Sequence, residues 1–259
     1  MKINGARVLL TGATGGIGHA IARRLKAEGA ELVLTGRRTD VLQPLADELG
    51  ARAVAADLND PAALDGLLAE AGDLDILVAN AALPGIGRMD TIAVEKIDAN
   101  LNVNLRAPML MSRALLPQLL ERGSGHLVFI GSVSGIVASP WSSMYNATKF
   151  GLRGFVSAMR QDLHGTGVSA SIVEPGFVRD AGMFVNSGME TPKGTRTVSP
   201  EQVAAGVVKA VTKDKGEVVV APVEIRAGAR FGSLFPSIND AAQRMGGAAE
   251  IASKHADND

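Results

Sequence analysis

The feature that most constrains the fold is a glycine-rich turn near the start of the chain. An apolar run typical of a buried strand comes first, Arg7-Val-Leu-Leu-Thr11. The turn that follows is Gly12-Ala-Thr-Gly-Gly-Ile-Gly18, and a helical pattern then runs from His19 to Glu28. Glycines let the backbone turn tightly and approach a pyrophosphate, to which a helix N-terminus offers free N–H groups. An ordinary turn between a strand and a helix needs fewer glycines. The pattern therefore predicts a dinucleotide-binding loop.

The rest of the chain alternates between strand and helix patterns. Helical patterns separate six further strand patterns, which are predicted at 31–35, 51–55, 75–79, 127–130, 168–174 and 217–221. This alternation predicts an α/β fold, a Rossmann-like doubly wound parallel sheet of about seven strands with helices on both faces. We expect one domain over 1–259, with a core over 1–221, a mobile substrate lid over 177–198 and a C-terminal extension over 222–259.

Composition argues against several classes of function. The net charge is −1 with acids and bases interspersed, so neither a nucleic acid nor an anionic membrane is indicated as a partner. The chain has no cysteine, and its four histidines lack ligand spacing, so no metal site is expected. The N-terminus lacks a signal-peptide layout, and no unbroken apolar stretch of about 20 residues predicts a membrane span. We therefore expect a soluble, cytoplasmic protein.

Two arginines follow the second strand pattern, where a dinucleotide fold discriminates the adenosine ribose. An acid at this position would accept hydrogen bonds from a free 2′-hydroxyl, but the chain has Arg37 and Arg38. Two guanidinium groups suit a 2′-phosphate through charge-assisted contacts, so NADP is favoured over NAD. The alternative is a solvated pair before the next helix. Asp57 ends the third strand pattern, where it can meet an adenine amino group.

The only tyrosine in the chain, Tyr145, precedes Lys149 by four residues. In a helix, positions i and i+4 share a face, so the phenol and the ammonium are predicted to be neighbours. A nearby cation favours the phenolate, so we expect a tyrosine pKa below its usual value of about 10. Ser132 follows the apolar run Leu127–Ile130, at the strand end where open α/β sheets bind ligands. Taken alone, the Tyr145–Lys149 spacing also fits an ordinary surface pair.

A long helical pattern runs from about Thr91 to Arg122 and is expected to break near Pro108 and Pro117. It contains Asn104, although asparagine is unfavourable inside a helix. A buried asparagine beside the site could hold a water molecule or bend the helix. From the residue type alone, a structural role is the expectation for Asn104.

Together these motifs resemble the short-chain dehydrogenase/reductase family in its single-domain form, over roughly residues 6–220. The motifs that carry the resemblance are Thr11-Gly12-Ala-Thr-Gly-Gly16-Ile-Gly18, Asp57, Asn80-Ala81, Asn104, Ser132, Tyr145-x-x-x-Lys149 and Pro175-Gly176. The resemblance implies hydride transfer between NAD(P) and a carbonyl/alcohol pair. The expected cofactor-binding residues are Gly12, Thr14, Gly15, Gly16, Ile17, Gly18, Arg37, Arg38, Asp57, Leu58, Asn80, Ala81, Tyr145, Lys149, Pro175, Gly176 and Val178.

The resemblance also implies four catalytic roles. Tyr145 would be the general acid in reduction and the general base in oxidation. Lys149 would lower the tyrosine pKa and bond the nicotinamide ribose, Ser132 would hydrogen-bond the substrate oxygen, and Asn104 would hold a water in a proton relay. These roles agree with the chemistry, because negative charge grows on the substrate oxygen as hydride arrives.

Two positions depart from the family pattern. Ala82 stands where the family usually has glycine, and Asp180 stands where a threonine often contacts the nicotinamide amide or the phosphates. A carboxylate would repel phosphates, which favours a different docking of the lid. Many NADP-binding members carry a basic residue where this chain has Gly15, so NAD stays an alternative.

Other interpretations stay open. The glycine spacing and the short chain argue against an epimerase or dehydratase of the extended branch, and the four catalytic residues argue against a nucleotide-bound regulator or scaffold without turnover. The predicted pocket, from 83–90, 134–144 and the lid, is apolar and favours a lipophilic ketone over a sugar. Family members are usually dimers or tetramers, so a homodimer or homotetramer is expected, and 226–245 is expected to pack on the domain or on another subunit.

Overall fold

A seven-stranded parallel sheet forms the centre of the structure, a computed structural model that describes residues 1–180 and 195–245. The strand order is β3-β2-β1-β4-β5-β6-β7. The strands are β1 (Arg7–Leu10), β2 (Glu31–Gly36), β3 (Arg52–Ala55), β4 (Ile76–Ala79), β5 (Gly125–Ile130), β6 (Val168–Pro175) and β7 (Glu217–Val220). The predicted doubly wound sheet is confirmed, and each of the seven strand patterns corresponds to a strand.

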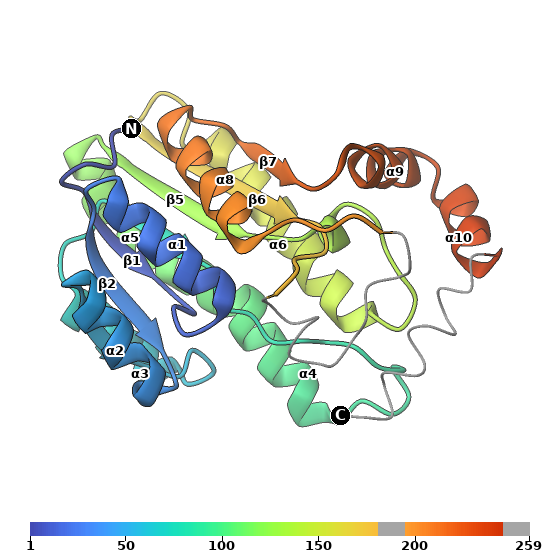
Figure 1. Ribbon diagram of the computed structural model, residues 1–259, viewed down its shortest axis with the longest axis horizontal. Coiled ribbons are helices and arrows are strands. Elements are labelled where there is room, and N and C mark those ends of the chain that lie inside the picture. Colours follow the sequence, from blue (N-terminus) through green and yellow to red (C-terminus); the bar gives the residue numbers. More distant parts are fainter. Residues whose placement is uncertain (181–194, 246–259) are drawn as a thin grey trace.

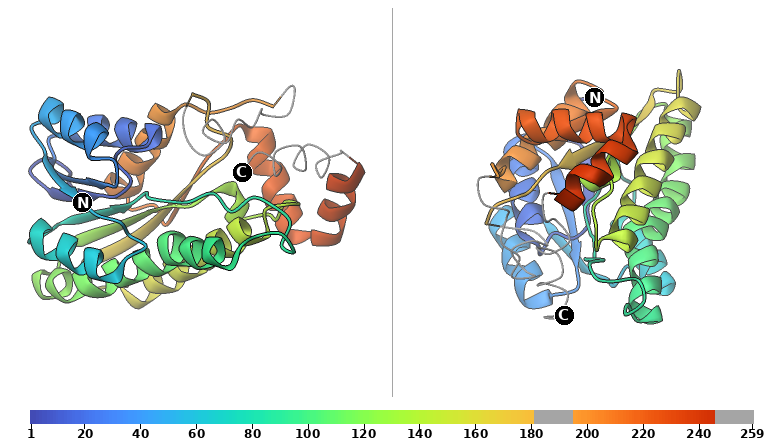
Figure 2. Two further views of the ribbon diagram at one scale, coloured as in Figure 1. Left: turned by 90° about the horizontal axis from the view of Figure 1, so that it is seen from below. Right: turned by 90° about the vertical axis from the view of Figure 1, so that its right-hand side faces the viewer.

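Helices cover both faces of the sheet (Figures 1 and 2). One face packs against α1 (Gly16–Ala27), α2 (Thr39–Leu49) and α8 (Pro200–Thr212), and the other against α3 (Pro61–Ala71), α5 (Ala107–Arg122) and α6 (Ser143–Asp162). Successive strand residues alternate between these two cores: Val8 and Leu10 belong to the first, and Leu9 belongs to the second. Because both faces are covered, β4 and β5 are buried at every residue and read as continuous apolar runs.

The carboxyl ends of the strands lie along one edge of the sheet. The chain reverses its winding between β1 and β4, and this switch opens the crevice in which α/β sheets bind ligands. The parallel register aligns Leu10 with Val78 and Ile130 with Val173. The residues that directly follow β1, β4, β5 and β6 are therefore brought to the same edge.

Two helices begin with side-chain caps. Asp60 accepts a hydrogen bond from the Ala62 N–H at 2.9 Å, and Pro61 follows it in the first turn of α3. Ser199 and Gln202 form a reciprocal capping box at the start of α8.

The long helical pattern is interrupted once rather than twice. It forms α4 (Val94–Leu101), a π-helical turn at Asn102–Arg106, and then α5. The π-helical turn ends two residues before Pro108, which lacks a backbone N–H to continue the α-helical hydrogen bonds, so the break predicted near Pro108 is confirmed. The break predicted at Pro117 is wrong, because α5 continues through it to Arg122. The buried face of α5, which includes Leu115 and Leu119, offsets the missing hydrogen bond.

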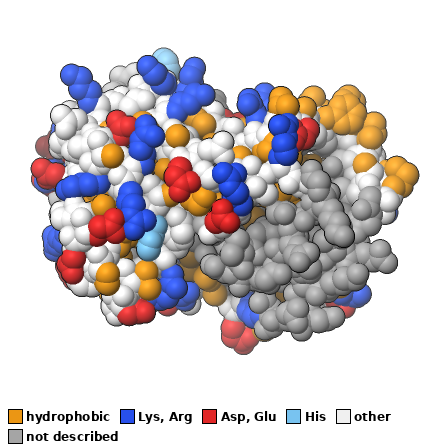
Figure 3. Space-filling view, viewed as in Figure 1, with side chains coloured by type: hydrophobic (Ala, Val, Ile, Leu, Met, Phe, Trp, Pro, Cys, Tyr) orange, Lys and Arg blue, Asp and Glu red, His pale blue; other side chains and the backbone are white. Residues whose placement is uncertain are grey.

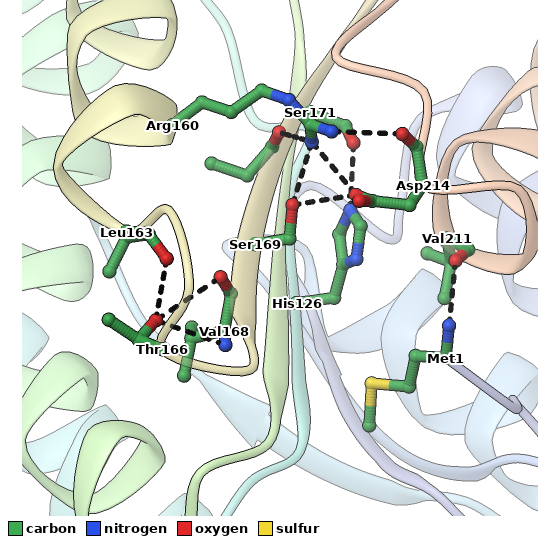
Figure 4. Close-up of polar contacts among 11 residues, drawn as sticks. Met1, His126, Arg160, Leu163, Thr166, Val168, Ser169, Ser171, Val211 and Asp214 are labelled. Atoms are coloured by element: carbon green, nitrogen blue, oxygen red, sulfur yellow. Dashed lines mark hydrogen bonds and ion pairs between the residues drawn. The ribbon is translucent and has the colours of Figure 1, made fainter.

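A polar network joins α6 to β6 and to the turn before β7 at the opposite edge of the sheet (Figure 4). Arg160 donates to Asp214 at 2.8 Å and to Ser169 at 2.7 Å, and these bonds hold the pKa of Asp214 down to about 2. His126 Nε2 lies 2.7 Å from the buried Ser171 hydroxyl, and burial lowers the histidine pKa to about 4. His126 is therefore a neutral structural residue.

The C-terminal extension forms two helices, α9 (Val223–Leu234) and α10 (Pro236–Met245), which project beyond the end of the sheet (Figure 1). Among the described residues, none of the helices has the length and the apolar character to cross a bilayer.

Candidate active site

The glycine loop after β1 is held by contacts that leave no room for side chains at two positions. Gly12 has a φ of +63°, and a Cβ there would lie 2.7 Å from the Ala81 Cα. A Cβ on Gly18 would lie 2.2 Å from the Gly12 carbonyl oxygen. These two glycines therefore pack the loop against β4 and the helix against the loop.

The space in front of α1 is open by contrast. A Cβ on Gly15 would meet its nearest neighbour, the Gly12 carbonyl oxygen, only at 3.7 Å. Gly15 is also the N-cap of α1 and provides no side-chain cap, so the first N–H groups of the helix stay available. Thr14 and Ile17 are partly buried beside this space. Open space at an uncapped helix N-terminus suits a pyrophosphate, so the residues fit a dinucleotide.

Asn80 and Thr11 lock the loop to the end of β4. The Thr11 hydroxyl accepts hydrogen bonds from the N–H groups of Asn80 and Ala81, both at 3.0 Å. The Asn80 amide donates to the carbonyls of Thr11 and Gly12, also at 3.0 Å. Asn80 and Ala81 thus lie at the glycine loop.

Arg37 and Arg38 both lie exposed at the end of β2, on the border of the crevice. Arg38 Nη2 donates to the Thr14 carbonyl, which holds this guanidinium against the glycine loop. Arg37 Nη1 lies 4.0 Å from an Asp57 carboxylate oxygen, and the Arg37 side chain is 61% exposed. An ion pair this long and exposed contributes little, so Arg37 can turn toward a ligand at small cost.

Ser132, Tyr145 and Lys149 converge beyond the end of β5. Ser132 directly follows the residue after β5, and Tyr145 lies in the first turn of α6. Lys149 Nζ lies 5.5 Å from the centroid of the Tyr145 ring and donates to the Ile130 carbonyl at 2.9 Å. The predicted proximity of the phenol and the ammonium is therefore confirmed.

The expected direction of the tyrosine pKa is wrong. Burial raises the pKa of Tyr145 to about 12, and a hydrogen bond with the Ser132 side chain lowers it only in part. Burial also lowers the pKa of Lys149 to about 8, because the residue is only 2% exposed and its ammonium has lost contact with water. The cost of charging a buried phenol thus exceeds the effect of the Ser132 hydrogen bond.

Asn104 lies in the π-helical turn and is fully buried. Its Oδ1 accepts from the Leu83 N–H at 2.7 Å, and its Nδ2 donates to the Leu83 carbonyl at 2.9 Å and to Asn100 Oδ1 at 3.1 Å. These bonds tie α4 and the π-turn to the loop after β4. Sequence reasoning missed Asn100, although its position four residues before Asn104 on one helix face was a usable signal.

The loop after β4 and the segment before α6 meet over Tyr145. The Gly85 carbonyl accepts from the Tyr145 N–H at 3.3 Å, and the Gly87 N–H donates to the Trp141 carbonyl at 2.7 Å. A Cβ on Gly85 would lie 2.9 Å from the Tyr145 nitrogen, so glycine is needed for this approach. The two loops therefore fix the position of the tyrosine.

Part of the predicted substrate pocket lies in the described residues. Ile136 and Met144 are buried, and Val137, Trp141 and Phe177 are partly buried. The two ends of the predicted lid are joined by a bridge between Val178 and Val198. Met183 and Phe184, which the sequence assigned to the lid, lie outside the described residues.

The residues around the end of β6 include one departure from the family pattern. The Gly176 N–H donates to the Val220 carbonyl at 3.0 Å and joins the turn after Pro175 to β7. Asp180 has a φ of +60°, its side chain is 83% exposed, and its carboxylate lies 3.7 Å from Arg179 Nε. A neighbouring arginine therefore partly neutralises this carboxylate.

Glu174 is a buried acid that sequence reasoning missed. Its side chain is 0% exposed, and Arg153 Nε lies 3.4 Å from Oε1. Burial and the neighbouring Glu217 carboxylate raise the pKa of Glu174 to about 8, although Arg153 opposes this. The available signal was an acid inside an apolar strand pattern, directly before Pro175.

The structure has the features of a Rossmann-like oxidoreductase. These are the order of the strands, the glycine loop at the switch point and the side chains gathered beside that loop. The chain belongs to the short chain dehydrogenase family, whose model matches residues 6–191.

Individual relatives agree with this assignment. A ketoacyl reductase of Nostoc, HetN, is 35% identical over 99% of this chain and 94% of its own length. The NADP-dependent 3-hydroxy acid dehydrogenase YdfG of Salmonella typhi is 36% identical over 77% of this chain and 86% of its own length. The closed form of a serine dehydrogenase complexed with NADP+ superposes with a TM-score of 0.77 at 34% identity, over 84% of this chain and 95% of that one.

Proposed function

We propose that the chain is an NADP-dependent oxidoreductase that interconverts a ketone and a secondary alcohol. The observation that carries this proposal is that Ser132, Tyr145 and Lys149 gather at the same edge of the sheet as the open space before α1. An acid and a hydrogen-bond donor would thereby lie beside the space in which the glycine loop would hold a dinucleotide.

The open end of α1 would hold the pyrophosphate, through the N–H groups that begin the helix after Gly15. Lys149 would bond the nicotinamide ribose, and the turn at Pro175 and Gly176, with Val178, would border the nicotinamide. Asp57 and Leu58 would border the adenine. A bound nicotinamide cofactor supplies the hydride in reduction and takes it in oxidation.

The protein side chains would then stabilise the negative charge that develops on the substrate oxygen and transfer a proton to it. In reduction, Tyr145 Oη gives its proton to the oxygen while negative charge develops there, and in oxidation it takes the proton back. The Ser132 hydroxyl donates a hydrogen bond to the same oxygen. General acid assistance of this kind is worth about 10²–10⁴-fold in rate. Asn104 would hold the loop after β4 in place. It would also hold a water molecule that takes part in a proton relay.

NADP preference rests on Arg37 and Arg38. Their guanidinium groups lie exposed at the end of β2, and Arg38 is fixed to the glycine loop through Thr14. Two relatives named with NADP, the YdfG enzyme and the serine dehydrogenase complex, support the same preference. The buried Ile136 and Met144 favour an apolar substrate, and we propose that the segment 177–198 closes over it as a lid.

The cofactor preference is tested by calorimetric titration with NADPH and with NADH. We expect NADPH to bind at least ~10-fold more tightly, a difference of about 1.4 kcal/mol. Arg38→Ala should weaken NADPH binding by a similar factor and leave NADH binding unchanged. Arg52→Ala, an exposed arginine on β3 away from the crevice, is the matched control. Equal binding of both cofactors by the wild type would refute the role of the two arginines.

Turnover is tested by Tyr145→Phe, which removes one oxygen atom. We expect the variant to bind NADPH as the wild type does and to lose at least ~100-fold in ketone reduction. Unchanged reduction would refute the catalytic role of Tyr145. Unchanged biological effect in a variant without turnover would favour a scaffold instead.

A further inference from the structure

Trp141 has a backbone conformation that a bulky residue rarely adopts. Its φ is +59°, in the left-handed region that favours glycine. The residue lies between Ser132 and α6, four positions before Tyr145. Strain of this kind persists only where the surrounding structure fixes it, and strained residues cluster at sites that bind ligands. The conformation of Trp141 therefore points to a binding role for its side chain.

The loop after β4 fixes the strained residue and places a cation over it. The Gly87 N–H donates to the Trp141 carbonyl at 2.7 Å. The next residue is Arg88, whose Cζ lies 6.0 Å from the centroid of the Trp141 ring. At this separation the face of the ring attracts the guanidinium and restricts its position. The strain in Trp141 is thus linked to the placement of a positive charge.

The partner of Arg88 in the structure is a carboxylate. Arg88 Nε and Nη2 donate to the two oxygens of Asp90, at 2.9 and 2.8 Å, which is the paired arrangement that guanidinium groups make with carboxylates. The two side chains are 60% and 62% exposed. An ion pair this open to water contributes little, because water and salt screen it. A carboxylate on a ligand can therefore take the place of Asp90 at small cost.

Arg88 is close enough to Tyr145 for one substrate to contact both. The Gly85 carbonyl oxygen lies 3.3 Å from the Tyr145 nitrogen, and the three residues from Gly85 to Arg88 span at most roughly 11 Å. A ketone several carbons away from a carboxylate can bridge this separation. The buried Ile136 and Met144 suit the carbon chain between the two groups.

The charge of the whole molecule does not select for an anion. The net charge is −1, and Figure 3 shows acidic and basic side chains interspersed over the face that it displays. Attraction of an anionic substrate therefore depends on an individual cation beside the site rather than on the summed field of the protein. Arg88 supplies such a cation.

We propose that Arg88 determines substrate specificity by binding the carboxylate of an oxo acid while the ketone of the same molecule meets Tyr145. This inference rests on the proposed function, because it assigns a substrate class to that site. Asp90 holds the guanidinium in the absence of substrate and releases it to the substrate carboxylate. A neutral ketone of the same length leaves the pair intact and gains neither hydrogen bond.

The first test reads the fluorescence of Trp141, which is the only tryptophan in the chain. The protein is titrated with heptanoate and, separately, with heptanamide, a neutral molecule of the same shape. We expect heptanoate to change the emission saturably at a concentration at least ~10-fold lower than heptanamide, because the amide loses the charge-assisted hydrogen bonds. Arg88→Gln should remove this difference, and Arg52→Gln, which changes an exposed arginine on β3, should keep it. No response to heptanoate, equal responses to both molecules, or a difference that survives Arg88→Gln would overturn the proposal.

The second test compares the NADPH-dependent reduction of 4-oxopentanoate, 5-oxohexanoate and 6-oxoheptanoate with that of their methyl esters. We expect kcat/KM to favour at least one acid over its ester by at least ~10-fold. Arg88→Gln should remove this preference through the KM of the acid rather than through kcat, because a contact remote from the reacting carbon is equal in the ground state and the transition state.

The outcomes of the second test separate this proposal from the proposed function. Reduction of the esters without an acid preference would overturn the role of Arg88 and keep the ketone reduction. Reduction of neither series, by a protein that still binds heptanoate through Arg88, would refute both and leave Arg88 as an anion site only.

A third variant tests the strained residue itself. Trp141→Gly suits a φ of +59°, so the loop keeps its conformation while Arg88 loses the ring beneath it. We expect the acid preference to fall at least ~3-fold. An unchanged preference would overturn the role of the ring.

Discussion

Replacing Glu174 by glutamine should change how stability depends on pH. The carboxyl is fully buried, and its pKa is raised from 4.5 to about 8, first by burial and then by the Glu217 carboxylate. A raised pKa means that the neutral acid stabilises the folded state. This contribution is fully present below pH 4.5 and is lost as the pH rises toward 8.

The size of the effect follows from the same two pKa values. Between these two pKa values, each rise of one pH unit lowers the free energy of unfolding of the wild type by about 1.4 kcal/mol, relative to a variant whose residue 174 does not titrate. From pH 5.5 to 7.5, the free energy of unfolding of the wild type should therefore fall by about 3 kcal/mol relative to that of Glu174→Gln. For a chain of this length, that difference corresponds to roughly 6–10 °C in Tm.

The assay is thermal and urea unfolding of both proteins at pH 5.5, 6.5 and 7.5. Other groups titrate over this range, so the difference between the two proteins is the quantity that reports on Glu174. Glu31→Gln, which changes an exposed glutamate at the start of β2, is the control and should show no pH-dependent difference. A wild-type-to-variant difference that stays constant with pH would refute the argument. It would mean that Arg153, 3.4 Å away, keeps Glu174 ionised against the cost of burial.

Two further predictions concern the glycine loop and α10. Gly12→Ala should destabilise the protein by at least ~3 kcal/mol in urea unfolding, because a Cβ there would lie 2.7 Å from the Ala81 backbone at a φ of +63°. Gly66→Ala, with open space inside α3, should instead stabilise by up to ~1 kcal/mol, and equal effects would contradict this. Asn239 and Gln243 both donate to the Ala138 carbonyl and so hold the loop after Ser132. Replacing both by alanine should raise the KM for the ketone about 3- to 10-fold in steady-state kinetics and leave NADPH binding unchanged. An unchanged KM would contradict this prediction.

The fold was predictable because its signals are local. Continuous apolar runs mark the central strands, and the glycines after β1 and the Asp60-Pro61 and Ser199-Pro200 starts mark the turns and caps. Pro117 was misjudged because its helix is stabilised by the buried face of α5, which depends on packing with other elements. Glu174 was missed for a related reason, since its partners Arg153 and Glu217 come from segments distant in the sequence.

The Tyr145–Lys149 pair shows what spacing can and cannot fix. Helical periodicity places the two side chains on one face, and the structure confirms this at 5.5 Å between Nζ and the ring centroid. The direction of the pKa changes depends on access to water, which is set by β5 and by the loops over α6 rather than by the helix. Burial raises the pKa of Tyr145 to about 12, so the tyrosine stays neutral, and this is the form that can donate a proton. Burial therefore favours Tyr145 as the general acid in a reduction. For Tyr145 to act as the general base in an oxidation, additional positive charge is required close to the phenol, to lower its pKa.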